Sequence, residues 1–261
     1  MTRNTTVLAN VAEGIATITL NRPDVMNSFH QEMVDELIGV LEEIKRDSTV
    51  KTVVLTGSGK AFCAGGDLGY IRSIADPITA RKFIASVGQI VTLIMTMEKP
   101  IIAMVNGVAA GAGFNIALAC DIIFCGQSAR FSQSFIKVGL IPDCGGLYLL
   151  PRIVGFHKAK ELMFTADLID SATALNLRIV KEVVGDAELK EVTYKFATRL
   201  AQSAPIALGL IKSMINRSDN LDLESTLASE ANLQAICMQT EDHKEGVAAF
   251  KEKRTPFFTG K

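Results

Sequence analysis

Two glycine-rich segments hold the residues whose types and spacing could do chemistry. They are AFCAGGD at 61–67 and NGVAAGAGFNIALACD at 106–121, and each follows an apolar run typical of a strand, at 53–57 and 100–107. Glycines at such places allow a sharp turn or a close backbone approach, and they leave backbone N–H groups free. Free N–H groups that converge on a carbonyl oxygen can stabilise the negative charge of a thioester enolate. The apolar helix expected after the second segment would add its dipole and first-turn N–H groups to that field.

A structural explanation of the same glycines competes with the chemical one. Gly65, Gly66, Gly111 and Gly113 could serve only tight turns and helix packing. Single glycines are weak motifs, and taken one at a time they favour the structural explanation. Other features of the sequence are therefore needed to distinguish the structural from the chemical explanation.

The overall composition argues against several classes of function. Of 261 residues, 27 are Lys or Arg and 28 are Asp or Glu, so the net charge is −1. Such a balance gives no indication of a nucleic-acid partner or of binding to a membrane. The three histidines, His30, His157 and His243, are far apart and show no ligand pattern, so we expect no metal.

The cysteines and the amino-terminal stretch indicate the compartment. Five cysteines at irregular positions form no CxxC pair and no disulfide framework, which fits a reducing environment. Residues 1–14 contain no apolar leader segment, and no run has the length and purity of a membrane span. We therefore expect a cytoplasmic protein.

The elements that must position the glycine segments follow from periodicity. Apolar and polar residues alternate over 6–21 around Glu13 and Gly14, which predicts a hairpin. The pattern then predicts a helix over 30–45, a strand over 51–56, a helix over 79–97, a strand over 100–105, a helix from Ala112 and a strand over 120–125. This alternation indicates an α/β fold with parallel strands and right-handed crossovers.

Beyond Pro142 the pattern is mostly helical. It predicts helices over 158–164, 172–180, 189–202, 204–216 and 223–238, with one short strand over 179–184. The last of these helices is amphipathic, and 48% of the chain is hydrophobic. Both features favour the burial of further surface between subunits.

Five motifs occur in an order and spacing that resemble the crotonase (enoyl-CoA hydratase/isomerase) superfamily. They are LNRPDVMNSF, AFCAGGDL, KPIIAMVNGVAAGAGFNIALACD, FSQSFIKVGLIPDCGG and EGVAAFKEKRTPFFTGK. The resemblance implies a crotonase-like spiral of ββα units over 1–200 and a helical oligomerisation and CoA-covering region over 201–261. It also implies a homotrimer, or a hexamer made of two trimers. The implied substrates are acyl-CoA thioesters, with coenzyme A as part of the substrate and no separate cofactor.

The resemblance assigns roles to single residues of these motifs. The two oxyanion-hole amides fall on Gly66 and Ala112, in agreement with the reasoning from the glycines. The implied CoA-binding residues, the last two of them reaching over from a neighbouring subunit, are Met26, Ala64, Asp67, Leu68, Phe250 and Lys253. Asp67 is better suited to fix its loop by accepting backbone N–H bonds, and Lys253 could equally be a solvated surface charge.

Three positions depart from the hydratases of the superfamily. The two glutamates that activate water in those enzymes match Asn115 and Phe135 here, and neither residue exchanges a proton as a carboxylate does. Phe135 would make that side of the substrate pocket apolar and exclude water from it. Asn115 either orients the acyl chain or is simply a polar helix residue. Where the hydratases have a glycine, this chain has Asp143, and several non-hydratase members place a catalytic aspartate there.

Asp143 is accordingly the candidate acid and base. Partial desolvation beside Phe135 would suit a carboxyl group that takes up a proton and returns it. The alternative is an N-cap on a short helix that starts near Gly145. Cys63 and Cys144 flank the expected pocket, where we interpret them as small buried residues rather than nucleophiles.

These departures predict an acyl-CoA isomerase that works through an enolate. The runs at 137–155 and 208–216 resemble the 1,2-epoxyphenylacetyl-CoA isomerase group of phenylacetate degradation, which uses an aspartate here and also shifts enoyl-CoA double bonds. One alternative is an enoyl-CoA hydratase that adds water with Asp143 alone. Another is a catalytically silent acyl-CoA-binding subunit, because a shared fold does not fix the function.

Overall fold

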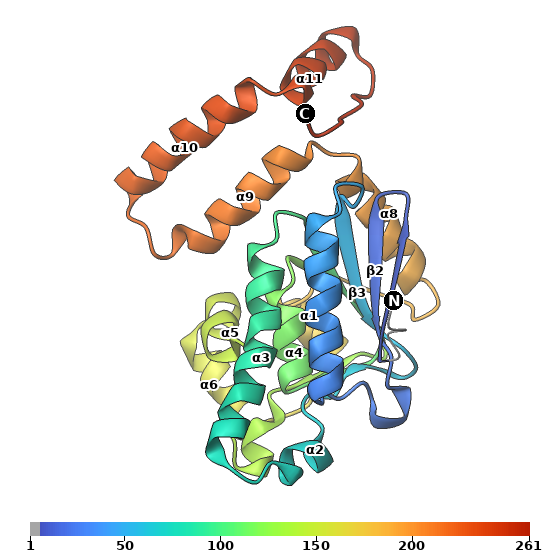
Figure 1. Ribbon diagram of the computed structural model, residues 1–261, viewed down its shortest axis with the longest axis vertical. Coiled ribbons are helices and arrows are strands. Elements are labelled where there is room, and N and C mark those ends of the chain that lie inside the picture. The colour runs from blue at the N-terminus through green and yellow to red at the C-terminus, as the bar shows by residue number, and fades with distance from the viewer. Residues whose placement is uncertain (1–5) are drawn as a thin grey trace.

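The chain forms two β-sheets with helices packed on them (Figure 1), and this computed structural model describes residues 6–261. The larger sheet has the strand order β1-β2-β3-β5-β7-β10. Its strands are Val7–Ala12 (β1), Ile15–Leu20 (β2), Thr52–Gly57 (β3), Ile101–Val105 (β5), Ile122–Gly126 (β7) and Glu182–Val184 (β10). β1 and β2 pair antiparallel and the other neighbours pair parallel, so the predicted α/β fold is confirmed.

The amino-terminal hairpin is formed by β1 and β2, as predicted. Ala12 pairs with Ile15, and the two turn residues Glu13 and Gly14 have φ angles of 52° and 76°. A two-residue turn with both φ angles positive matches the twist of the flanking strands and favours glycine. Residues 1–5, which belong to the stretch where we expect no leader segment, lie outside the described residues.

A smaller sheet of four short strands is the part of the core that periodicity did not predict. Its strands, in the order β4-β6-β8-β9, are Ala61–Cys63 (β4), Val108–Ala110 (β6), Arg130–Ser132 (β8) and Ile169–Asp170 (β9). β4, β6 and β8 each follow a strand of the larger sheet, so the chain passes from the larger sheet to the smaller one three times. Glycine is needed at one crossing, because a Cβ on Gly107 would lie 2.0 Å from the carbonyl oxygen of Lys60. The repeated strand, strand and helix form the spiral that the resemblance implies.

Three helices pack on the sheets and hold the core. They are Gln31–Arg46 (α1), Pro77–Thr96 (α3) and Ala112–Ala119 (α4), and they confirm the helices predicted over 30–45, over 79–97 and from Ala112. α1 buries its apolar face, made of Met33, Val34, Leu37, Val40, Leu41 and Ile44. Every residue of α4 is buried. Because α4 starts at the second glycine segment, the core fixes the position of that segment.

α3 corrects one expectation from the sequence. Among the described residues it is the one helix with the length and composition of a membrane span, although the sequence was expected to contain no such run. Packing explains its apolar character, because α3 contacts α1, α4 and the later helix α9 (Pro205–Ser218). Its buried residues follow helical spacing and are Phe83, Val87, Ile90, Val91, Leu93 and Ile94. This is the pattern of a helix with one face in a protein core.

The remainder of the chain is mostly helical, as predicted. Its helices besides α9 are Gly146–Val154 (α5), Phe156–Thr165 (α6), Ser171–Asn176 (α7), Leu189–Ala201 (α8), Leu223–Met238 (α10) and Glu241–Glu252 (α11). The helix predicted over 172–180 ends at Asn176, because Arg178 has a positive φ of 60°. The predicted short strand is β10. α8 packs on β3, β5 and β7 and covers one face of the larger sheet.

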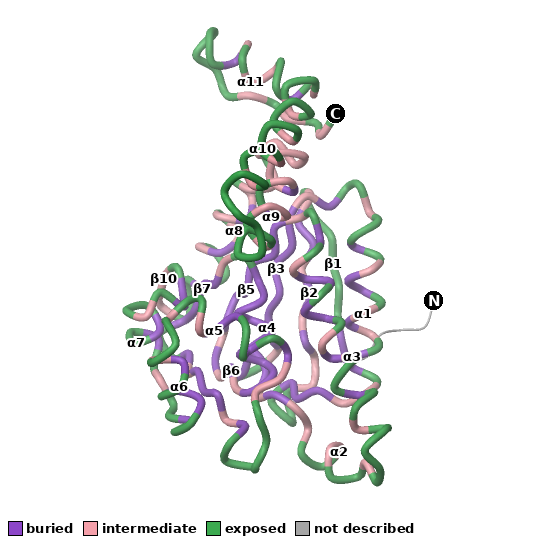
Figure 2. Tube along the Cα trace, turned by 90° about the vertical axis from the view of Figure 1, so that its left-hand side faces the viewer, coloured by how far each residue is buried: buried purple, intermediate pink, exposed green. Residues whose placement is uncertain are grey.

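α9, α10 and α11 extend from one end of the molecule (Figure 1), and much of their surface is exposed (Figure 2). We call these three helices the carboxy-terminal arm. They enclose a groove of about 860 Å³, and α10 contains no buried residue. Lys212 anchors the arm, since it is 8% exposed and its Nζ lies 2.8 Å from the carboxylate of Asp121. Asp121 also accepts the N–H of Ile101 at 2.7 Å, so the arm is tied to the larger sheet.

Candidate active site

A cavity of about 360 Å³ brings the two glycine segments together. Helix α2 (Leu68–Ser73), helix α3 and the 3-10 helix η2 (Ser134–Val138) complete its walls. The lining is mainly apolar and includes Phe29, Ala64, Leu68, Ile71, Ile74, Phe83, Ile84, Val87, Ala112, Phe135, Val138 and Leu140. Ser134, Lys137 and Asp143 supply the polar side chains of the lining. The cavity therefore combines apolar walls with a carboxyl group.

Two backbone N–H groups at this cavity have no partner. Gly66 and Ala112 both line it, and no acceptor within residues 6–261 bonds the N–H of either. Ala112 is the first residue of α4, so its N–H is one of the donors that a helix leaves unpaired in its first turn. The two segments touch, because a Cβ on Gly65 would lie 2.9 Å from the Ala110 oxygen and 3.4 Å from the Ala112 nitrogen. Two free donors thus come from neighbouring pieces of backbone.

The glycines of the second segment allow this close approach. A Cβ on Gly113 would lie 2.2 Å from the carbonyl oxygen of Cys63, so no side chain fits between α4 and β4. Gly111 has φ 52° and ψ −126°, a conformation that residues with a side chain avoid. The structural and the chemical explanations of the glycines are therefore complementary. Tight packing at Gly113 is what brings the Ala112 N–H beside the first segment.

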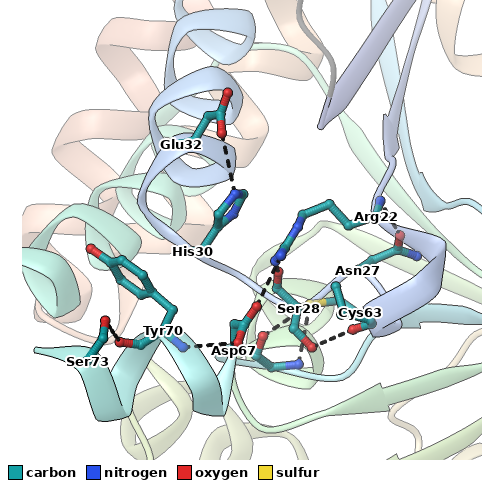
Figure 3. A network of polar contacts seen from close by, with 11 residues as sticks. Arg22, Asn27, Ser28, His30, Glu32, Cys63, Asp67, Tyr70 and Ser73 are labelled. Atoms are coloured by element: carbon teal, nitrogen blue, oxygen red, sulfur yellow. Dashed lines mark hydrogen bonds and ion pairs between the residues drawn. The ribbon is translucent and has the colours of Figure 1, made fainter.

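Asp67 fixes the first glycine segment (Figure 3). Its Oδ1 accepts the N–H of Tyr70 at 3.1 Å as the N-cap of α2, and its Oδ2 pairs with Arg22 at 3.1 Å. The Arg22 guanidinium also donates to the carbonyl oxygen of Ser28 at 2.5 Å. Burial acts to raise the pKa of Asp67, but the Tyr70 N–H and Arg22 outweigh it and hold the pKa below its usual value. Asp67 thus remains charged and ties its loop to the segment before α1.

Asp143 presents its carboxyl group to the cavity. Its Oδ1 is buried without a hydrogen-bond partner. Burial raises the pKa of Asp143 above its ordinary value, although a hydrogen bond with the Cys144 thiol acts in the opposite direction. The N-cap alternative is wrong, because Gly145 occupies the N-cap of α5 and no side chain caps that helix. The carboxyl group is therefore free to exchange protons with a bound molecule.

Phe135 and Asn115, the residues that by resemblance match the hydratase glutamates, differ in placement. Phe135 is 8% exposed and lines the cavity, with its ring next to Gly111. Asn115 is fully buried, its Nδ2 donates to the carbonyl oxygen of Asp143 at 2.8 Å, and its Oδ1 accepts from Gln133 at 2.7 Å. Both ends of that amide are used inside the protein. Asn115 therefore does not face an acyl chain, and it is more than a polar residue of a helix.

The other predicted CoA-binding residues do not line the cavity of their own chain. Met26 is 53% exposed, and its carbonyl oxygen accepts the N–H of Ala64 at 2.9 Å. Phe250 is 86% exposed on α11, and Lys253 caps that helix. α11 and α2 lie at opposite ends of the molecule (Figure 1), so α11 can meet a cavity only in a second subunit.

The cysteines are placed as buried residues. Cys63 and Cys144 are both buried, and burial raises the pKa of the Cys63 thiol to about 12. Burial also raises the pKa of Cys144. Thiols in this state are poor nucleophiles.

Sequence reasoning missed Ser134 and Lys137, which line the cavity from η2. In a 3-10 helix, residues three apart lie on one face, so the two side chains share a side of η2. If the run around Phe135 had been recognised as a 3-10 helix, the three-residue spacing would have identified Ser134 and Lys137. The remaining missed lining residues are apolar and come from α2, α3 and η2 and from the loop positions Phe29, Ile74 and Leu140.

Three comparisons place this geometry among known proteins. Residues 10–261 match the sequence profile of the enoyl-CoA hydratase/isomerase family. The chain is 39% identical to the 1,2-epoxyphenylacetyl-CoA isomerase of Escherichia coli (strain K12) over 98% of both chains. It is 38% identical to the short-chain-enoyl-CoA hydratase of Clostridium acetobutylicum over 92% of both. The crystal structure of an enoyl-CoA hydratase from Bacillus anthracis superimposes with a TM-score of 0.95 at 32% identity, covering 98% of this chain and all of that one.

Proposed function

The chain belongs to the enoyl-CoA hydratase/isomerase family, and from that premise we propose that it is an acyl-CoA isomerase with Asp143 as acid and base. The observation that carries the proposal is the polar content of the cavity. Among residues 6–261, Asp143 supplies the one carboxyl group of the lining, and Phe135 stands where a second one would be needed. A single carboxyl group can carry both halves of a 1,3-proton shift.

The proposed reaction moves a double bond into conjugation with the thioester. With a 3-enoyl-CoA, the Asp143 carboxylate takes a proton from C2, and the electron pair passes into a dienolate. The thioester oxygen then carries the negative charge, which the N–H groups of Gly66 and Ala112 stabilise. Asp143 returns the proton to C4, and a 2-enoyl-CoA forms with no net change in atoms. The same enolate stabilisation and carboxyl group would serve the rearrangement of an epoxide-bearing acyl-CoA.

The environment of Asp143 favours this role. Its raised pKa makes the carboxylate a stronger base and brings the pKa nearer to neutral pH, where a group that both takes and gives a proton is most effective. The apolar side chains of the cavity keep water away from the dienolate. No cofactor enters this scheme, because coenzyme A arrives as part of the substrate.

Hydration of a 2-enoyl-CoA is the second candidate. It is favoured by the relatives named as hydratases, of which the Clostridium acetobutylicum protein is 38% identical. Water addition needs a group that holds and activates the water. Since Phe135 and Asn115 supply no carboxylate, Asp143 would have to do this alone.

Incubation with 3-hexenoyl-CoA in deuterated water tests the proposal. Mass and conjugated-thioester absorbance are followed together. Conjugation without a net gain of water supports the proposed isomerase activity. A hydrated product would indicate a hydratase instead. If neither conjugation nor deuterium uptake occurs with 3-hexenoyl-CoA or with an epoxide-bearing aromatic acyl-CoA, the chain is a silent acyl-CoA binder. Asp143→Asn should slow conjugation by about 10²- to 10⁴-fold, whereas Asp167→Asn, an exposed aspartate with the same loss of charge, should leave it unchanged.

We further propose that the active form is a homotrimer or a pair of trimers. The apolar groove of the carboxy-terminal arm supports this proposal, because it is lined by residues such as Ile211, Ile215 and Leu227 that are at least half exposed in one subunit. A second subunit would bury them. It would also bring α11 to a neighbouring cavity.

A further inference from the structure

The proton shift as described leaves one polar network without a role. Asn115 lies fully buried in α4, where its Nδ2 donates to the backbone carbonyl of Asp143 at 2.8 Å. Its Oδ1 accepts from Nε2 of Gln133 at 2.7 Å. Gln133 is 1% exposed and directly precedes η2. The Asn115 amide thus joins α4, the loop that holds Asp143 and the entry to η2.

The packing around this amide leaves it little freedom. A Cβ on Gly146 would lie 2.3 Å from Nδ2 of Asn115, so the amide lies directly against the first residue of α5. The Asp143 carbonyl also accepts the N–H of Gly146 at 2.9 Å. Both bonds converge on one carbonyl oxygen, which fixes the peptide plane that follows Asp143.

The loop between Asp143 and α5 needs such support. Cys144 has φ 48° and Gly145 has φ 74°, so two successive residues are in the left-handed region. A residue with a side chain adopts that conformation at a cost, and it persists where surrounding contacts hold it. Relaxation of Cys144 would turn the preceding peptide and move the Asp143 side chain.

We propose that Asn115 is a positioning residue for the proton-moving group: by holding the Asp143 carbonyl it aims the carboxyl group of Asp143 into the cavity, and Gln133 orients the Asn115 amide. The inference rests on the proposed function, in which Asp143 moves the proton. In this proposal Asn115 does not touch the substrate. Its amide holds the loop that carries Asp143, whereas a glutamate at position 115 would act on water.

Kinetics of two variants provide the first test. For Asn115→Ala, kcat for 3-hexenoyl-CoA should fall on the order of 100-fold, as expected for a displacement of about 1 Å at the reacting centre. The Kd for hexanoyl-CoA, which cannot isomerise, should change by less than about twofold, because no contact with substrate is lost. Asn216→Ala is the matched control, since Asn216 Nδ2 also donates to a backbone carbonyl at 2.8 Å, that of Met95 in α3.

A double variant asks whether Asn115 acts through Asp143. Asn115→Ala should slow the Asp143→Asn protein no further, because a misplaced loop matters only while its carboxyl group is present. A further loss in the double variant would overturn the inference, as would a loss of hexanoyl-CoA affinity in Asn115→Ala as large as the loss of kcat.

Hydrogen exchange keeps the inference testable apart from activity. The amide of Gly146, which bonds the Asp143 carbonyl, should exchange faster in Asn115→Ala and at the wild-type rate in Asn216→Ala. Unchanged exchange at Gly146 would overturn the inference. A wild-type protein with no isomerase activity would instead contradict the proposed function, and the exchange measurement would still report whether Asn115 holds the loop.

Two milder variants serve if Asn115→Ala does not fold. Asn115→Leu keeps a similar shape but removes the donor to the Asp143 carbonyl, and it should reproduce both the loss of kcat and the faster exchange. Gln133→Met leaves Asn115 in place without its own orienting bond, and it should give a smaller effect in the same direction. If both proteins fold and turn over like the wild type, the inference is wrong.

Discussion

At the residue scale, Asp143 shows how the proposed catalytic role of a carboxyl group opposes stability. A buried carboxyl oxygen without a partner is costly when the group is charged. The same burial raises the pKa and creates a proton acceptor suited to the proposed reaction. An uncharged side chain at position 143 would make the protein more stable.

Replacement of this carboxyl group should therefore stabilise the protein at neutral pH. Because the pKa is raised in the folded state, the stability linked to Asp143 is fully present below its ordinary pKa of 3.8 and is lost as the pH rises through the raised value. Asp143→Asn should melt above the wild type at pH 7 to 8, and the difference should shrink toward pH 4. Thermal melts across this range measure it. A variant that melts below the wild type at every pH would mean that the carboxylate stabilises the fold.

The residues of the site were predictable to different degrees. The two glycine segments could be located because a glycine-rich run after a strand has a local signature, and the resemblance then assigned Gly66 and Ala112 within them. The carboxyl group of Asp143 could be located only by resemblance, since its burial depends on Phe135 and on α5 packing. The pairing of Arg22 with Asp67 joins residues 45 apart in the chain. No local pattern encodes such a contact.

At the scale of elements, the long helices and all strands of the larger sheet except β10 were predictable from a periodicity that extends over five or more residues. The smaller sheet was not, because β4, β6 and β8 have three residues each and β9 has two. Such strands are too short to show an alternation. Their positions are set by the glycine crossings and by pairing with one another.

The contact between α4 and β4 makes Gly113 a test of the oxyanion site. Gly113→Ala would place a methyl group 2.2 Å from the Cys63 oxygen, so α4 has to shift. We expect a loss of about 1–3 kcal/mol in the free energy of unfolding, as for other overpacked sites. The shift would also move the Ala112 N–H, and the loss of one such donor lowers kcat on the order of 100-fold.

Gly39→Ala is the matched control for this variant. Gly39 lies in α1, and no atom lies within 4 Å of the position of its Cβ. Alanine there should raise the free energy of unfolding by about 0.5–1 kcal/mol through helix propensity. Equal effects of the two substitutions on kcat would contradict the argument about Gly113.

At the scale of the whole molecule, the anchor of the carboxy-terminal arm is a buried charge. Asp121→Asn keeps the shape of the side chain but leaves the Lys212 ammonium, which is 8% exposed, without its counter-charge. The free energy of unfolding should fall on the order of 2–3 kcal/mol, as when a charged partner is removed. Denaturant titration measures this loss. Glu161→Gln, which breaks the exposed Lys158–Glu161 pair, should change it by less than about 0.5 kcal/mol.

The proposed assembly makes a prediction about α11. If a neighbouring subunit brings Phe250 to the CoA moiety, Phe250→Ala should raise KM about 10-fold with little change in kcat, since binding away from the reacting atoms is lost. Phe156→Ala removes an aromatic ring of similar exposure, 71% against 86%, and should leave KM unchanged. Sedimentation establishes that both variants assemble as the wild type does. An unchanged KM in Phe250→Ala would show that Phe250 does not bind the CoA moiety.

The exposed part of the apolar cavity wall also bears on how such proteins diverge. Leu68, Ile84, Val138 and Leu140 line the cavity, yet they are 59%, 40%, 50% and 44% exposed. Substitutions at exposed positions usually change stability by less than about 0.5 kcal/mol. Mutation can therefore change the shape of this part of the cavity by single tolerated substitutions. At Gly113, which contacts β4, no substitution is tolerated in this way. New substrates would be acquired at these exposed positions without loss of the proposed stabilisation of an enolate by the N–H groups of Gly66 and Ala112.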